Sequence, residues 1–379
     1  MTRTSRGYWR VGDEVGHRLF ATLHGDADGA FHFESGESLS NVTVAYETLG
    51  TLNSDASNAV LVEHALTGDS HVSGPSGPGH PTKGWWDGLV GPGLAIDTTR
   101  FFVVCANVLG GSQGTTGPSS LNTSGRPFGS SFPRITIRDQ VKIEVRLATH
   151  IGIDEWHAIV GGSMGAMRAL EWAVGYPSRV KKLVLLAVGA ASNADQIALS
   201  SLQVRAIKAD PLYFGGDYYD KGVGPRDGLA IARGIGHLTY RSSGELDSRF
   251  GRNVQGQEDP LKGGRYAIES YLEHQGEKLA ARFDANSYVV LSEAMNLHDV
   301  GRHRGGVESA LSKIRADTII IGISSDRLYP LVLQEELAEK IPGAHNLVVV
   351  SSIVGHDGFL LEIDQIEKIV GPALRDERR

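Results

Sequence analysis

Short apolar runs of strand length most constrain what this chain can fold into. They occupy residues 41–46, 59–63, 101–106, 157–160, 183–188, 318–323 and 347–350, and most are apolar throughout. A strand with one face in water alternates apolar and polar residues, so uninterrupted runs indicate strands buried on both faces. Helical patterns lie between them at 138–151, 166–174 and 334–340. This alternation predicts an α/β fold with a mostly parallel central sheet flanked by helices.

The middle of the chain has a different pattern, with few strand signals. Its helical stretches are residues 196–208, 225–240, 265–282 and 286–297. We therefore expect one α/β core, built from residues 1–195 and 306–379, with an inserted helical lid at 196–305.

A glycine-rich turn follows the run at 157–160 and contains Gly161-Gly162-Ser163-Met164-Gly165. G-x-S-x-G between a strand and a helix is typical of a strained turn that exposes a nucleophilic serine. The backbone N–H of Met164, at the start of the helix, is then placed to stabilise an oxyanion. An incidental serine in a strand–helix turn is the simpler alternative.

A nucleophilic serine needs a base, and the base needs a third group to hold its tautomer. Asp326 and His356 each follow a late predicted strand, in the chain order serine, acid, histidine. Alone, Asp326 could be a turn or N-cap residue and His356 a surface histidine. The second oxyanion donor is expected after the run at 59–63, where Leu66 N–H is the candidate.

Composition excludes several classes of function. The net charge of −7 argues against non-specific nucleic-acid binding. The single cysteine, Cys105, cannot form an intrachain disulfide and is expected to be a buried strand thiol. The N-terminus has no signal-peptide pattern, and no apolar run is long enough to span a membrane, so we expect a cytoplasmic protein. Neither H-E-x-x-H nor paired C-x-x-C occurs, so no metal site is expected.

Taken together, the motifs resemble those of the homoserine O-acyltransferases of methionine biosynthesis, a family with the α/β-hydrolase fold. The resemblance spans nearly the whole chain, and its most specific parts are the stretch at 114–120 and the lid motifs. It rests on Val44–Gly50, His64–Gly68, Asn107–Gly111, Gly114–Ser120, Gly161–Gly165, Gly236–Arg241, Ser270–Gly276 and Gly355–Phe359.

The resemblance implies transfer of an acyl group from a coenzyme A thioester to the homoserine hydroxyl through an acyl-serine. It gives the catalytic roles to Ser163, Asp326 and His356, and the oxyanion hole to Leu66 and Met164. Arg233 and Asp357 match residues that bind the amino acid. Arg233 could instead form an ion pair with a lid acid, and Asp357 could cap a helix.

Tyr240 lies on the same helical face as Arg233 and is expected either to line that pocket or to belong to the core. The resemblance also implies acetyl-CoA as co-substrate, no tightly bound cofactor, and a homodimer formed through the lid helices. The acetyl donor is favoured over succinyl because no cationic partner for a succinyl carboxylate stands near Ser163. The alternatives are O-succinyl transfer to homoserine or serine, a serine esterase, and a non-catalytic binding module.

Overall fold

A computed structural model describes residues 7–375 and contains one large central sheet. Its strand order is β1-β4-β8-β5-β9-β10-β11-β12. All pairs from β8 to β12 are parallel, whereas β4 pairs antiparallel with both β1 and β8. The strands are β1 Leu19–His24, β4 Asn41–Leu49, β5 Ala59–Glu63, β8 Phe102–Ala106, β9 Trp156–Gly162, β10 Val180–Leu186, β11 Asp317–Ile323 and β12 Val348–Val350.

The central strands are covered on both faces, as their apolar runs predict. In β10, Leu183 and Leu185 pack into one core, while Val184 and Leu186 pack into the other. The first core includes α1 (Ile137–His150), α2 (Met164–Gly175) and α9 (Leu331–Lys340). The second includes α11 (Ile363–Leu374) and the short strands β6 (Val90–Gly91) and β7 (Ile96–Asp97). The predicted α/β architecture is confirmed.

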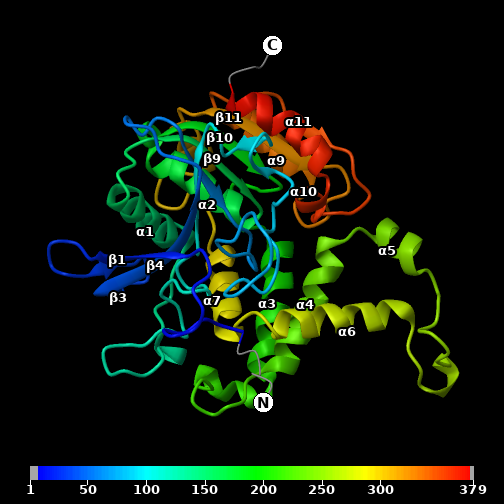
Figure 1. The fold of residues 1–379 in the computed structure, drawn as a ribbon. Helices are drawn as coiled ribbons and strands as arrows, with labels where there is room; N and C mark the ends of the chain where they lie inside the picture. Colours follow the sequence, from blue (N-terminus) through cyan, green and yellow to red (C-terminus); the bar gives the residue numbers. More distant parts are fainter. Residues whose placement is uncertain (1–6, 376–379) are drawn as a thin grey trace.

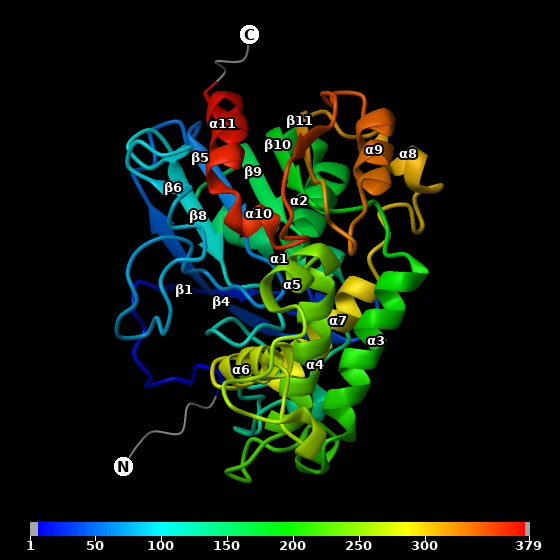
Figure 2. The same ribbon diagram turned by 90° about the vertical axis from the view of Figure 1, so that its right-hand side faces the viewer.

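The segment of the chain between β10 and β11 is mostly helical. They are α3 Ala194–Ala209, α4 Arg226–Tyr240, α5 Ser243–Phe250, α6 Ala267–Ala280, α7 Ala285–Asn296 and α8 Val307–Leu311. Helices α3, α4, α6 and α7 gather below the sheet in Figure 1. Figure 2 shows the same grouping from the side. The short helix α10 (Gly358–Leu361) follows the loop that carries His356. The domain boundaries at 195 and 305 remain a prediction.

Two parts of the sheet differ from the sequence pattern. β1 was not predicted, because its exposed and buried residues alternate and its apolar signal is short. The strand at 41–46 was grouped with the parallel strands, but it extends to Leu49 and is antiparallel to its neighbours. Cys105 lies buried in β8, as expected. Within residues 7–375, no helix is both long and apolar enough to cross a bilayer.

Candidate active site

Ser163 occupies a strained position between β9 and α2, with φ 56° and ψ −124°. Positive φ is costly for a residue with a side chain and usually marks a functional turn. The flanking glycines make the turn possible. A Cβ on Gly161 would lie 2.5 Å from the Gly165 carbonyl carbon, and a Cβ on Gly165 would lie 2.0 Å from the Glu63 carbonyl oxygen. The G-x-S-x-G spacing is therefore a steric requirement of this turn.

Two late loops bring the proposed base and acid to Ser163. His356 Nε2 lies 2.8 Å from Ser163 Oγ, and His356 Nδ1 lies 2.6 Å from Asp326 Oδ2. The other carboxylate oxygen, Asp326 Oδ1, accepts the backbone N–H groups of Leu328 and Tyr329, each at 2.8 Å. Asp326 therefore accepts hydrogen bonds within its own turn, which is the alternative role considered from the sequence, and its other oxygen also contacts His356. The three side chains form the linear arrangement of a hydrogen-bonded nucleophile, base and acid.

The electrostatics of this group favour a charged imidazole. Burial alone would lower the pKa of His356, but the charge of Asp326 and its hydrogen bond outweigh burial, and the pKa is raised. The Tyr329 ring stacks on the imidazole at a centroid distance of 5.1 Å. A base held in one orientation beside a buried carboxylate is suited to accept the serine proton.

The backbone N–H groups of Leu66 and Met164 are both unengaged. Met164 is the first residue of α2, where an amide has no partner within the helix. Among the described residues, neither amide has a hydrogen-bond acceptor. Leu66 and Ser163 both line the same cavity. The two amides are therefore available to a ligand oxygen near Ser163.

A cavity of about 110 Å³ lies between the loops that carry Ser163 and His356 and the helices α3, α4 and α7. Ser163 and His356 form part of its wall, and Arg233, Tyr240 and Asp357 line it as well. Helix α4 supplies Arg233 and Tyr240, and the guanidinium lies 5.3 Å from the centre of the Tyr240 ring. All three residues inferred for substrate binding thus surround the serine.

The contacts of Arg233 and Asp357 test the alternative roles considered for them, an ion pair with a lid acid and a helix cap. Within residues 7–375, Arg233 forms no ion pair with a lid acid. Asp357 stands at the N-cap of α10, but its side chain makes no capping hydrogen bond. Its Oδ2 instead lies 3.2 Å from Arg241 Nε, a pairing that sequence reasoning missed. No local signal marked this pairing, because Arg241 at the end of α4 meets Asp357 only through tertiary packing.

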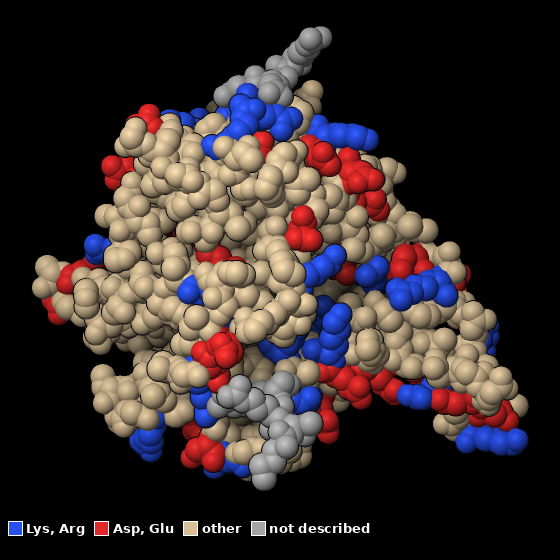
Figure 3. Space-filling model, viewed as in Figure 1, with Lys and Arg blue, Asp and Glu red and all other residues tan. Residues whose placement is uncertain are grey.

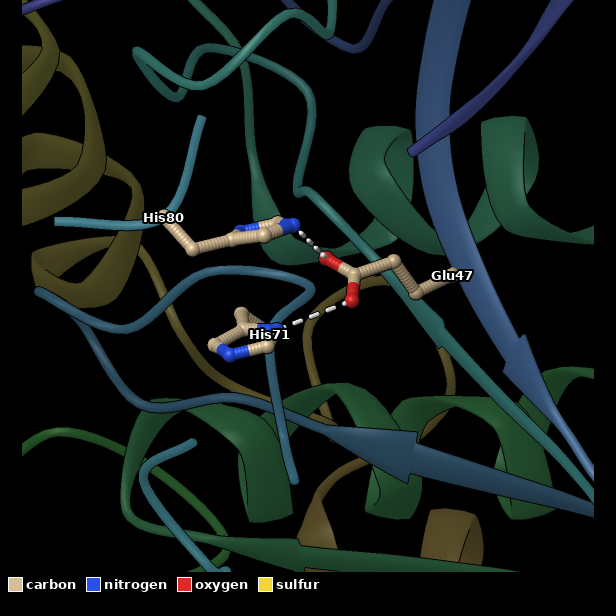
Figure 4. A group of neighbouring side chains, drawn as sticks. All are labelled: Glu47, His71 and His80. Atoms are coloured by element: carbon tan, nitrogen blue, oxygen red, sulfur yellow. Dashed lines mark hydrogen bonds and ion pairs between the residues drawn. The ribbon is translucent and has the colours of Figure 1, made fainter. Parts of the chain in front are cut away.

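One group of described residues offers three possible metal ligands: Glu47, His71 and His80 (Figure 4). His71 Nδ1 lies 3.0 Å from Glu47 Oε2, and His80 Nε2 lies 3.8 Å from Oε1. The two imidazoles stack, with centroids 3.9 Å apart and planes inclined by 13°. Ring lone pairs lie in the ring plane, so nearly parallel stacked rings do not converge on one ion. In addition, His80 Nε2 already accepts the N–H of His17. The group fits a hydrogen-bonded loop anchor better than a metal site.

Comparisons with known proteins agree with this geometry. A family model for the alpha/beta hydrolase fold matches residues 58–363. A homoserine O-acetyltransferase from Thermobifida fusca (strain YX) is 59% identical over 365 residues, which cover 96% of this chain and 95% of that protein.

Two solved structures show how far the fold extends to other activities. The homoserine O-acetyltransferase from Bacillus anthracis has a TM-score of 0.85 and 28% identity, covering 94% of this chain and 97% of that one. Esterase E22 has a TM-score of 0.84 and 28% identity, covering 94% of this chain and all 100% of that one. The scaffold alone therefore does not distinguish acyl transfer from hydrolysis.

Proposed function

The chain belongs to the homoserine O-acetyltransferase family on the α/β-hydrolase fold, and from this premise we propose how its residues carry the acyl group. The enzyme is an acyltransferase. The observation that carries the proposal is the hydrogen-bonded series Ser163–His356–Asp326, which opens into a cavity lined by the guanidinium of Arg233. The reaction has two half-reactions at one serine.

In the first half-reaction, His356 removes the Ser163 proton while Oγ attacks the thioester carbonyl of acetyl-CoA. The carbonyl oxygen becomes negative and accepts hydrogen bonds from the N–H groups of Leu66 and Met164. The tetrahedral intermediate then collapses. Its C–S bond breaks, coenzyme A leaves as the thiol after taking the proton from His356, and the acetyl group stays on Ser163.

In the second half-reaction, homoserine replaces coenzyme A in the cavity. The planar guanidinium of Arg233 suits the α-carboxylate, because two parallel N–H groups match its two oxygens. Asp357 suits the α-ammonium, with Arg241 holding its Oδ2 and no described partner at Oδ1. His356 takes the homoserine hydroxyl proton while the oxygen attacks the acyl-serine. The bond between the acetyl carbon and Ser163 Oγ then breaks, His356 returns the proton to Oγ, and O-acetylhomoserine leaves. Tyr240 lies against Arg233 and orients it.

The charge distribution on one face supports an anionic co-substrate. Figure 3 shows Lys and Arg side chains gathered where the core meets the region of α4 and α5. Coenzyme A carries several phosphate charges, and a positive rim raises its local concentration near the cavity. Arg282 is a further cation near the cavity, since its Nη1 donates to Thr67 O in the cavity wall. Acetyl-CoA is a diffusible co-substrate in this scheme, and no cofactor remains bound.

A homodimer through the lid is supported by exposed apolar side chains on two neighbouring helices. Leu202 on α3 is 51% exposed, and Ile231 on α4 is 59% exposed. Surfaces of this kind mark contact sites when they are contiguous. Light scattering after size-exclusion chromatography measures the state directly; a monomer at micromolar concentration would rule out the dimer. The cytoplasmic setting stays a prediction.

Coenzyme A release tests the proposed function. Sustained thiol release from acetyl-CoA, beyond the single equivalent that acylation of Ser163 liberates, should require homoserine, and all release should be abolished in Ser163→Ala. Succinyl-CoA and serine, substituted one at a time, identify the donor and the acceptor. Equal turnover with and without homoserine would instead indicate an esterase on this scaffold. Faster release from succinyl-CoA would assign the chain to succinyl transfer.

A further inference from the structure

A fully buried ion cluster lies directly behind the proposed oxyanion hole. Arg168 Nη1 is 2.6 Å from Glu63 Oε2 and 2.6 Å from Glu144 Oε1, and the exposed fractions of these side chains are 0%, 0% and 5%. Removing such charges from water costs several kcal/mol per ion, and apolar residues often replace them without loss of stability. No step of the acyl transfer uses these groups. The presence of these charged groups despite their cost therefore points to a role in holding the neighbouring backbone in place.

The guanidinium joins the two elements that carry the oxyanion donors. Arg168 lies on α2, just after Met164, while Glu63 is the last residue of β5 and precedes the loop with Leu66. Besides its carboxylate contacts, Arg168 Nη2 donates to the His64 carbonyl oxygen at 2.7 Å. Arg168 thus fixes the start of the Leu66 loop against the helix that begins at Met164.

The side chain of His64 makes two further contacts at the start of the same loop. Its Nε2 accepts the Val108 N–H at 3.1 Å, and its Nδ1 lies 2.8 Å from the Ala65 carbonyl oxygen. Burial, and then the charge of Arg168, lower the pKa of His64 to about 3. The imidazole is therefore neutral at pH 7, with Nδ1–H as donor and Nε2 as acceptor. The loop that leads to Leu66 is therefore held by hydrogen bonds at two consecutive residues, His64 and Ala65.

The charges of the cluster balance if one carboxyl group is protonated. Burial raises the pKa of Glu63 well above its ordinary value; Arg168 opposes this and Glu144 adds to it. With Glu63 neutral, one guanidinium faces one carboxylate. Glu144 is held further by Trp172, whose Nε1 donates to Oε2 at 2.9 Å. Removing Arg168 alone would leave a buried anion, so a test of its role must also remove that charge.

We propose that Arg168, with Glu144 and Glu63, is a positioning residue that sets the spacing between the N–H groups of Leu66 and Met164. The inference rests on the proposed function for the identity of those two donors. Oxyanion donors act through preorganisation, so a small displacement of one amide weakens transition-state stabilisation without changing how substrate binds.

The informative variant is the double substitution Arg168→Met with Glu144→Gln, which leaves no buried charge. A matched control lies on the same helix at Glu171, which is 3% exposed and whose Oε2 accepts from Arg304 Nη1 at 2.8 Å. Arg304→Met with Glu171→Gln removes an ion pair on the same helix that does not touch the Leu66 loop, with the Arg304 side chain 19% exposed. Thermal unfolding of both double variants measures the general structural cost.

The readout is the inhibition constant of a small alkyl boronic acid. Its tetrahedral adduct with Ser163 places an oxygen between the two amides, and the constant does not depend on the folded fraction of enzyme. The Arg168 double variant should bind the boronic acid about 10- to 100-fold more weakly, with a matching fall in kcat for an acetyl ester and an unchanged KM. The Arg304 control should match wild type in all three quantities.

Equal boronic-acid affinity in wild type and the Arg168 double variant would overturn the proposal, even if that variant were less stable. Equal weakening in the control would also overturn it, because the effect would then be a general loss of structure. Neither measurement involves homoserine or coenzyme A. If the enzyme failed to acylate homoserine while the Arg168 effect persisted, the proposed function alone would fail.

Discussion

Replacing Asp326 with asparagine should preserve the fold and reverse the direction of the serine–histidine hydrogen bond. In the structure, Asp326 Oδ1 accepts two backbone N–H groups and Oδ2 faces His356 Nδ1. Asparagine has one acceptor oxygen, and the two backbone donors require it. Its NH₂ group then faces Nδ1, which must become an acceptor. The ring proton moves to Nε2 and points at Ser163 Oγ, so His356 can no longer take the serine proton.

The size of the effect follows from losing the base while keeping the oxyanion hole and the cavity. A histidine held in the wrong tautomer costs on the order of 10⁴-fold in kcat, or about 5.5 kcal/mol of transition-state stabilisation. Thiol release from acetyl-CoA in the presence of homoserine measures kcat, and thermal unfolding checks the fold. The backbone hydrogen bonds of the loop are kept, so the melting temperature should change little.

Asp357→Asn is the matched charge control, because Asp357 is adjacent to His356 but does not hydrogen-bond to Nδ1. It should leave acylation of Ser163 intact and raise the KM for homoserine. An Asp326→Asn enzyme within tenfold of wild type would refute the tautomer argument. A well-folded Asp357→Asn enzyme that had lost acylation would show that nearby negative charge, and not the hydrogen bond, is what His356 needs.

Further predictions follow from other contacts. Gly165→Ala places a Cβ against the Glu63 carbonyl oxygen and should cost about 1–3 kcal/mol in unfolding free energy, with loss of kcat; chemical denaturation and turnover test both. Arg233→Gln should raise the KM for homoserine by at least about tenfold while leaving acylation unchanged, and stopped-flow acylation separates the two. The acid limb of kcat/KM should have its midpoint above 6.5, because the pKa of His356 is raised and the protonated ring is inactive; a midpoint below 6.5 would contradict this. Glu63→Gln should gain stability relative to wild type as pH rises above the ordinary glutamate pKa, since a raised carboxyl pKa favours the protonated fold; melting curves across pH test the sign.

The candidate site residues could be predicted from the sequence where they directly follow the end of a strand. Ser163, Asp326 and His356 each follow an apolar strand, and parallel strands bring such loops to one edge of the sheet. The apolar runs were sufficient for the central strands, because burial on both faces leaves a strong local pattern. The alternating pattern of β1 lacks that signal, and its antiparallel pairing with β4 depends on tertiary contacts.

Partnerships between distant charged residues were not predictable from the sequence. Arg241 pairs with Asp357 only because the end of α4 lies beside the loop that carries His356. Arg168 and Glu144 meet because α2 and α1 pack on the same face of the sheet. The available signal was a charged residue within an almost wholly apolar helix, which indicates that a buried partner exists but does not identify it.

Mass spectrometry of the Ser163 peptide tests the central claim most directly. After brief incubation with acetyl-CoA in the absence of homoserine, that peptide should gain one acetyl group. Addition of homoserine should remove the group and yield an equal amount of O-acetylhomoserine. Absence of the adduct in an active enzyme, or its transfer to water at the same rate as to homoserine, would contradict acyl transfer through Ser163.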